Sequence, residues 1–218
     1  MLQHLSYLDP VLKNFKRNDW PALPNRKNNL PSGVLVPLLC DNPWTCLLTQ
    51  RAASLRTHAG EICFPGGKPD PHDPSLKHTA LREAKEELNI THGKVIAELS
   101  SVPLYTSEYR IYPFLALFPE TTHPEANTEE VALILPVSLV ALLSLPYLDG
   151  VPFEYYGQKY TSPIFDLNRI GLNVTQKVYG GTAHVLYETL QLTAHALNRT
   201  VPPLKDTYER FPFNHSST

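Results

Sequence analysis

The stretch that decides the fold lies at residues 79–90 and reads TALREAKEELNI. On a helical projection Glu83 and Glu87 lie about 40° apart, and Glu86 lies about 60° to the other side of Glu83, so three carboxylates share one face. Like charges at this spacing destabilise a helix by about 0.2–0.5 kcal/mol per pair. A divalent cation would offset the repulsion, and Mg²⁺ prefers a few carboxylates together with water and phosphate oxygens. The pattern therefore favours a metal site suited to diphosphate chemistry.

An ordinary solvent-facing helix surface would explain the same glutamates, with Arg82 and Lys85 as their partners, because charge runs are usually solvated. The residues before the helix weigh against this reading. Residues 64–67 read FPGG and predict a bend, and a proline-rich loop follows at residues 68–74. Since proline fixes φ, this loop loses less entropy when it orders and can deliver the chain to the helix in one conformation.

The 21 prolines delimit the other elements, because a proline inside a helix costs about 3 kcal/mol. Long helices are expected in two proline-free windows, residues 75–102 and 164–201. In the second window, apolar residues form one stripe from Ala183 to Leu197. The remaining β-rich runs, bounded by proline or glycine, are residues 33–39, 45–50, 94–101, 111–118 and 131–135. The pattern predicts one mixed α/β domain whose sheet is covered by the two helices.

The composition excludes several classes of protein. The chain has 218 residues with a net charge of −2, so it lacks the positive surface of a protein that binds nucleic acid or an anionic membrane. No stretch approaches the roughly 20 apolar residues of a membrane span, and residues 1–20 lack the apolar core of a signal peptide. Cys40, Cys46 and Cys63 have no spacing typical of a disulfide framework or zinc ribbon. We therefore expect a cytoplasmic protein without nucleic-acid or membrane partners.

The bend, the loop and the acidic helix together resemble the Nudix box, Gly-x5-Glu-x7-Arg-Glu-U-x-Glu-Glu-x-Gly-U, in which U is bulky and apolar. The chain departs from the box at two positions: the early acid is Asp73, with eight residues before Arg82, and the last glycine is Asn89. Asparagine readily adopts the left-handed conformation that closes a helix, so Asn89 can end the helix as the glycine of the box would. The matching residues are Gly67, Arg82, Glu83, Glu86, Glu87 and Ile90.

A second motif resembles the signature of the coenzyme A diphosphatases within the Nudix superfamily. It begins with LLTQRA at residues 47–52, continues through Arg56 and Gly60, and joins the box at the Gly-Gly of residues 66–67. Two spaced motifs that meet at one point make accidental agreement improbable. The resemblance covers about residues 30–200.

The resemblance implies an α/β/α sandwich with a mixed β-sheet between helices. It divides the chain into an N-terminal helix or extension at residues 1–29, a Nudix domain at residues 30–200 and a C-terminal tail at residues 201–218. It also implies a requirement for Mg²⁺ or Mn²⁺ and hydrolysis of the diphosphate of coenzyme A or its thioesters. The products are 3′,5′-ADP and a 4′-phosphopantetheine compound, and we expect a monomer or homodimer.

The resemblance also assigns roles to residues. Glu83 and Glu87 are the first metal ligands and Glu86 is a further ligand, whereas Arg82 orients the glutamates by ion pairing. The expected catalytic residues are therefore Glu83, Arg82 and Glu86. The general base is open between Glu83 and a carboxylate from a distant loop, for which the candidates are Glu108, Glu129 and Glu130.

Arg56 is the first candidate for binding the extra 3′-phosphate of coenzyme A, because an arginine fork suits phosphate. The other expected substrate-binding residues are Arg51, Lys68, Gly66 and Gly67. Surface arginines without a ligand are the alternative reading for Arg51 and Arg56. Two other functions stay open: a broader nucleoside-diphosphate-X hydrolase of the ADP-ribose type, and a Nudix-fold module that binds a nucleotide without cleaving it.

Overall fold

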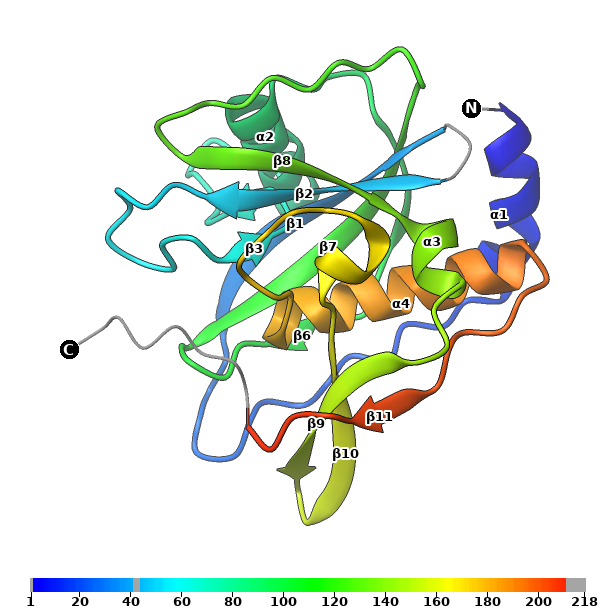
Figure 1. Ribbon diagram of the computed structural model, residues 1–218. Coiled ribbons are helices and arrows are strands. Elements are labelled where there is room, and N and C mark those ends of the chain that lie inside the picture. The colour runs from blue at the N-terminus through cyan, green and yellow to red at the C-terminus, as the bar shows by residue number, and fades with distance from the viewer. Residues whose placement is uncertain (1, 41–43, 211–218) are drawn as a thin grey trace.

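A mixed sheet of eight strands lies at the centre of the computed structural model, which describes residues 2–40 and 44–210 (Figure 1). Strands β1 and β7 run parallel to each other over their full lengths, and the other pairings in this sheet are antiparallel. The strands are β1 (Leu30–Leu39), β2 (Thr45–Arg51), β3 (Ile62–Cys63), β4 (Gly66–Gly67), β5 (Lys94–Glu98), β6 (Val102–Pro103), β7 (Tyr109–Phe118) and β8 (Val131–Ser138). Each of the five strands expected from the sequence is present.

Helices cover both faces of the sheet, as expected for an α/β/α sandwich (Figure 1). Helix α2 (Leu76–Leu88) packs on one face, where Leu35 and Phe114 meet its buried alanines. The opposite face, which includes Val34 and Val36, packs against α1 (Leu2–Asn14), α3 (Leu139–Leu143) and α4 (Gly180–Ala196). Because successive residues of β1 point to opposite faces, this one strand contributes to both cores.

The absence of a side chain at Gly33 brings α2 close to β1. An ideal Cβ built on Gly33 would lie 2.3 Å from the backbone oxygen of Leu76, so any larger residue would push the helix away. At its other end α2 closes at Asn89, which has φ 52° and donates its N–H to the Lys85 carbonyl at 3.0 Å. The left-handed helix end expected at Asn89 is confirmed.

The second half of the chain differs in detail from the expectation. Helix α4 begins only at Gly180, because residues 165 and 178 pair as a β-bridge and Leu167–Ile170 forms a 3₁₀ turn, η1. A smaller sheet contains β9 (Leu148–Tyr155), β10 (Gln158–Ile164) and β11 (Leu204–Asp206). Strand β11 belongs to the stretch expected to be a tail and pairs in parallel with β9. The last part of that stretch, residues 211–218, lies outside the described residues.

Helix α1 contains Pro10 and lies outside both proline-free windows. Its buried Leu8 and Val11 join the core formed with α4, and this packing offsets the unfavourable proline. The rule that long helices avoid proline was therefore wrong for this helix. Among the described residues, no helix is both long enough and apolar enough to cross a membrane.

Candidate active site

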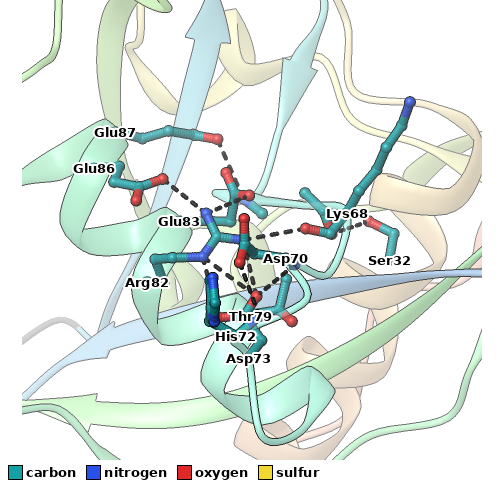
Figure 2. Close-up of polar contacts among 12 residues, drawn as sticks. Ser32, Lys68, Asp70, His72, Asp73, Thr79, Arg82, Glu83, Glu86 and Glu87 are labelled. Carbon is teal, nitrogen blue, oxygen red and sulfur yellow. Dashed lines mark hydrogen bonds and ion pairs between the residues drawn. The ribbon is translucent and has the colours of Figure 1, made fainter.

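Arg82 holds together acidic residues from helix α2 and from the loop before it (Figure 2). Its Nη1 lies 2.9 Å from Glu83 Oε1 and donates to Glu86 Oε2 at 2.8 Å. Its Nη2 donates to Asp73 Oδ2 at 3.0 Å and to the Lys68 carbonyl at 3.1 Å. One guanidinium therefore fixes the loop onto the helix and sets the direction of two glutamates.

Asp73 is a positioning residue to which sequence reasoning assigned no role. The hydrogen bonds from Arg82, followed by one from the backbone N–H of Asp70, lower the pKa of Asp73 to about 2. Asp70 in turn accepts a hydrogen bond from the His72 N–H at 2.9 Å, which closes the turn. The sequence did carry one signal of this role: Asp73 is the acidic residue nearest to the position at which the Nudix box has its early glutamate.

The Gly-Gly bend forms strand β4 and provides the floor beneath the glutamates. Gly67 pairs with Gly33, and Gly66 pairs with Val34. An ideal Cβ on Gly66 would lie 2.5 Å from the Gly33 carbonyl oxygen, whereas one on Gly67 would lie 2.4 Å from Glu83 Oε1. Gly66 is thus required by the strand pairing, and Gly67 makes room for a carboxylate.

Glu87 is a buried carboxylate, only 2% exposed. Its Oε1 accepts a long hydrogen bond of 3.4 Å from the Gly66 N–H, and none of the ion pairs among the described residues includes it. Burial, reinforced by the charges of Glu83 and Glu130, raises the pKa of Glu87 to about 7. Burial also raises the pKa of Glu83, although Arg82 opposes the shift. The positive charge around Glu83 and Glu87 is therefore too small to offset burial and the repulsion between carboxylates.

The chemistry of this donor set fits a hard divalent cation such as Mg²⁺ or Mn²⁺, because the available ligands are carboxylate oxygens that repel one another. In their present positions, no three His, Cys, Asp or Glu side chains of residues 2–40 and 44–210 converge as a metal site. Glu86 is paired with Arg82. The carboxylates of Glu83 and Glu87 lie beside the glycine bend, at Gly67 and Gly66 respectively.

A pocket of about 260 Å³ adjoins this acidic face through Gly66. Of the residues expected to bind substrate, Arg51 and Gly66 line this pocket, whereas Arg56, Lys68 and Gly67 do not. Arg56 is exposed on the loop between β2 and β3, and Lys68 lies over the ring of Tyr109 at 5.1 Å. The pocket is lined by residues 32, 34, 51, 58, 61–64, 66, 104–106, 111 and 179–182.

Arg51 is the cation at the acidic end of the pocket. Its charge lowers the pKa of Glu87, opposing the effect of burial. Its Nε is buried and has no hydrogen-bond partner among the described residues. A buried donor without a partner costs free energy, so this guanidinium is suited to an anionic ligand. Sequence reasoning ranked Arg56 above Arg51 because Arg56 matches the upstream signature, whereas Arg51 departs from it.

The structure separates the candidates for the general base. Glu108 accepts hydrogen bonds from the backbone N–H groups of Lys27 and Asn28, at 2.8 and 3.0 Å, and so is committed to the N-terminal segment. The charge of Glu130, in contrast, raises the pKa of both Glu83 and Glu87. Glu129 is exposed and is not among the main causes of these shifts in pKa.

The loop that carries Glu130 is fixed to the C-terminal end of α2. The Asn127 N–H donates to the Glu87 carbonyl at 2.9 Å, and the Glu125 N–H donates to the Leu88 carbonyl at 2.9 Å. The Asn89 side chain adds a hydrogen bond to Glu125 at 3.1 Å. Three bonds thus hold this loop across the helix end, and because the charge of Glu130 acts on both Glu83 and Glu87 we group these three carboxylates as one acidic cluster.

Comparison with known families and proteins gives consistent matches. A model described as the NUDIX domain matches residues 29–155. A protein of Photorhabdus laumondii named "Uncharacterized Nudix hydrolase NudL" is 45% identical over 143 residues, which cover 64% of this chain and 76% of that protein. A protein of the same name from Yersinia pestis is 37% identical over 172 residues, which cover 75% of this chain and 79% of the relative.

Solved structures with similar folds include a MutT protein from Methanosarcina mazei Go1, with a TM-score of 0.43 and 26% identity. That match covers 53% of this chain and 81% of the other. The NUDIX domain of Shewanella oneidensis NrtR, solved with ADP ribose, has a TM-score of 0.41 and 19% identity, covering 63% of this chain and 87% of the other.

Proposed function

Because the chain belongs to the Nudix family, we propose that it is a Mg²⁺- or Mn²⁺-dependent diphosphatase acting on coenzyme A or its thioesters. The products would be 3′,5′-ADP and the corresponding 4′-phosphopantetheine compound. The observation that carries the proposal is the position of the Glu83 and Glu87 carboxylates, which lie at a glycine bend beside a pocket lined by an unpartnered arginine nitrogen. The choice of coenzyme A rests on the signature at residues 47–67.

Glu83 and Glu87 would hold the cation, with Glu86 as a further ligand. When bound, such a cation neutralises diphosphate oxygens and lowers the pKa of water. Arg82 acts through the glutamates, because its ion pairs set their directions and its bonds to Asp73 fix the loop. The protein therefore supplies mainly position and charge.

Glu130 is the general base that we favour. It lies in the same acidic cluster as Glu83 and Glu87, but it forms none of the ion pairs with Arg82, whereas Glu83 is held by that arginine. A carboxylate that is neither a first metal ligand nor paired with arginine can accept a proton from the attacking water at its own oxygen. Glu108 is excluded from this role by its bonds to the N-terminal segment.

Arg51 would contact the phosphate groups from the wall of the pocket, through the guanidinium whose Nε has no hydrogen-bond partner in the described part of the chain. Arg56 and Lys68 are exposed outside the pocket and are the candidates for the 3′-phosphate, which carries two negative charges and suits a solvent-facing cation. Gly66 lines the pocket and Gly67 makes room for the Glu83 carboxylate, so together they keep the floor of the site free of side chains.

Assays of the purified full-length chain with Mg²⁺ on coenzyme A, 3′-dephospho-coenzyme A and ADP-ribose test the proposal. The products should be identified by mass. We expect the highest kcat/KM for coenzyme A or a thioester, with cleavage between the two phosphates. Equal or better turnover of ADP-ribose would assign the chain to the broader hydrolase class, and tight nucleotide binding without turnover would assign it to the binding modules.

A further inference from the structure

A second, smaller hollow of about 70 Å³ adjoins the 260 Å³ pocket. Tyr105, Gly180 and Gly181 line both, so the two hollows meet at the first turn of α4 and this tyrosine, whereas Gly66 lines only the larger one. We name the smaller hollow the end pocket. Its lining residues are Trp20, Leu23, Val102, Pro103, Tyr105, Phe153, Tyr155, Ser162, Gly180, Gly181 and His184.

The lining of the end pocket is uncharged: none of the residues that form it within ranges 2–40 and 44–210 is Asp, Glu, Lys or Arg. His184 lies 3.0 Å from Ser162 Oγ through its Nε2, and burial lowers the pKa of its ring to about 4, so the ring is neutral at pH 7. The Tyr155 hydroxyl donates to the Pro21 carbonyl at 2.6 Å. Since these polar groups already have partners, the end pocket favours an apolar occupant.

The size of the end pocket excludes a nucleobase. An apolar cavity of about 150 Å³ holds one benzene ring, and the end pocket has about half that volume. A purine is larger than benzene and does not fit, whereas a short aliphatic group does. The larger pocket has room for the chain that would connect such a group to the diphosphate.

We propose that the end pocket receives the acyl group of a short-chain acyl-coenzyme A, while the pantetheine arm occupies the 260 Å³ pocket. The inference rests on the proposed coenzyme A diphosphatase function. The order of the parts supports it: the acidic face meets the larger pocket at Gly66, and the end pocket follows past Tyr105. This order matches a substrate whose diphosphate, uncharged arm and acyl group follow one another along one chain.

Two residues set the upper limit on the acyl group. Leu23 and Phe153 line the end pocket and also line a larger outer hollow of about 530 Å³, so they separate the two spaces together with Tyr105. Leu23 comes from the segment after α1, and Phe153 comes from strand β9. Removing either side chain would join the end pocket to the outer hollow and admit a longer chain.

The test compares kcat/KM of the Mg²⁺-loaded full chain for acetyl-, butyryl- and octanoyl-coenzyme A. Each buried methylene contributes roughly fourfold in binding, and a chain that outgrows the pocket loses that gain. We expect octanoyl-coenzyme A to be at least about tenfold poorer than butyryl-coenzyme A for the wild type. Phe153→Ala and Leu23→Ala should each raise the octanoyl-to-acetyl ratio about tenfold.

Phe15→Ala is the matched control, because Phe15 is a partly buried aromatic residue of the main core and lines neither pocket. Its octanoyl-to-acetyl ratio should equal that of the wild type. Thermal unfolding identifies any variant that fails to fold. If both pocket variants fail to fold, the dependence of wild-type kcat/KM on acyl chain length tests the inference alone.

Equal wild-type turnover of acetyl- and octanoyl-coenzyme A would overturn the inference, as would unchanged ratios in both folded variants. Failure of the proposed function gives a different result: either ADP-ribose is cleaved as well as or better than the coenzyme A compounds, or none of the compounds is cleaved. The two failures are therefore distinguishable in one panel.

Discussion

The carboxylate of Glu83 occupies the space in which a side chain at position 67 would begin, since a Cβ on Gly67 would lie 2.4 Å from Glu83 Oε1. The neighbouring Gly66 instead faces backbone, with its Cβ position 2.5 Å from the Gly33 oxygen and 2.8 Å from the Val34 Cα. The two positions are adjacent, but they lack room for a side chain for different reasons: a side chain fills the space at Gly67, and backbone fills it at Gly66. This difference gives the first prediction.

Gly67→Ala should impair catalysis more than folding, because the end of a flexible glutamate can move aside. A displacement of about 1 Å at a reacting centre can cost about 100-fold in rate, and we expect a loss of that order. Gly66→Ala should instead destabilise the fold by about 1–3 kcal/mol, because backbone atoms cannot make room. Urea unfolding and kcat measurements on both variants check this, and equal stability losses would contradict it.

Glu83→Gln and Glu87→Gln should each abolish most metal-dependent turnover while the fold stays intact. Without metal at pH 8, Glu87→Gln should also raise the free energy of unfolding, because it removes a buried charge that has no ion pair. Turnover assays and urea unfolding in a chelator measure the two effects. Glu129→Gln on the exposed loop is the matched control, and near-normal turnover in both site variants would exclude the metal site.

Glu130→Gln should lower kcat by about 10²–10⁴-fold if Glu130 accepts the proton from water. Glu129→Gln changes the adjacent carboxylate in the same way and should stay within about twofold of the wild type, since Glu129 is exposed and is not among the main causes of the raised pKa of Glu83 or Glu87. The rate at saturating substrate and metal is the deciding measurement. A small effect at Glu130 would return the role to Glu83.

Arg82 and Asp73 should act as one unit. Arg82→Lys cannot reproduce the planar fork that contacts Asp73, Glu83 and Glu86, and Asp73→Asn removes the charge that fixes this fork. We expect each variant to lower kcat about tenfold or more, with the double variant no worse than Arg82→Lys alone. A double-mutant cycle on kcat measures this, and fully additive losses would show that the two residues act separately.

His184 should make stability depend on pH between about 6.5 and 4. Burial lowers the pKa of its ring from 6.5 to about 4, so the folded protein keeps the ring neutral while the unfolded chain protonates it. The contribution is fully present above pH 6.5 and is lost as the pH falls toward 4. At about 1.4 kcal/mol per pKa unit, it amounts to about 3 kcal/mol.

Urea unfolding of the wild type and His184→Gln at pH 7.5 and 4.5 tests this dependence. The variant should lose less stability over that range, whereas His123→Gln, at an exposed position, should follow the wild type. Identical losses in the wild type and His184→Gln would contradict the assignment.

The acidic helix could be predicted because its signal is local. The spacing of Glu83, Glu86 and Glu87 fixes one helix face whatever surrounds it, and Asn89 closes the helix by its own conformational preference. A mixed α/β domain whose sheet is covered by helices followed from the alternation of short β-rich runs with two proline-free windows. The α/β/α sandwich itself was implied by the resemblance to the Nudix family.

The pocket could not be predicted in the same way, because its walls come from segments far apart in the chain. Arg51, Leu104 and Tyr179 meet only when β2, the loop after β6 and the start of α4 have packed together. Two other features could not be predicted for the same reason. The helix around Pro10 and the pairing of β11 with β9 both depend on packing between distant segments.

The recognised domain ends at residue 155, yet helix α4, which starts at Gly180, forms part of the wall of both pockets. The carboxylate face and the glycine bend lie wholly inside the domain. A change confined to the start of α4 can thus reshape one wall of both pockets while leaving the carboxylates of α2 in place.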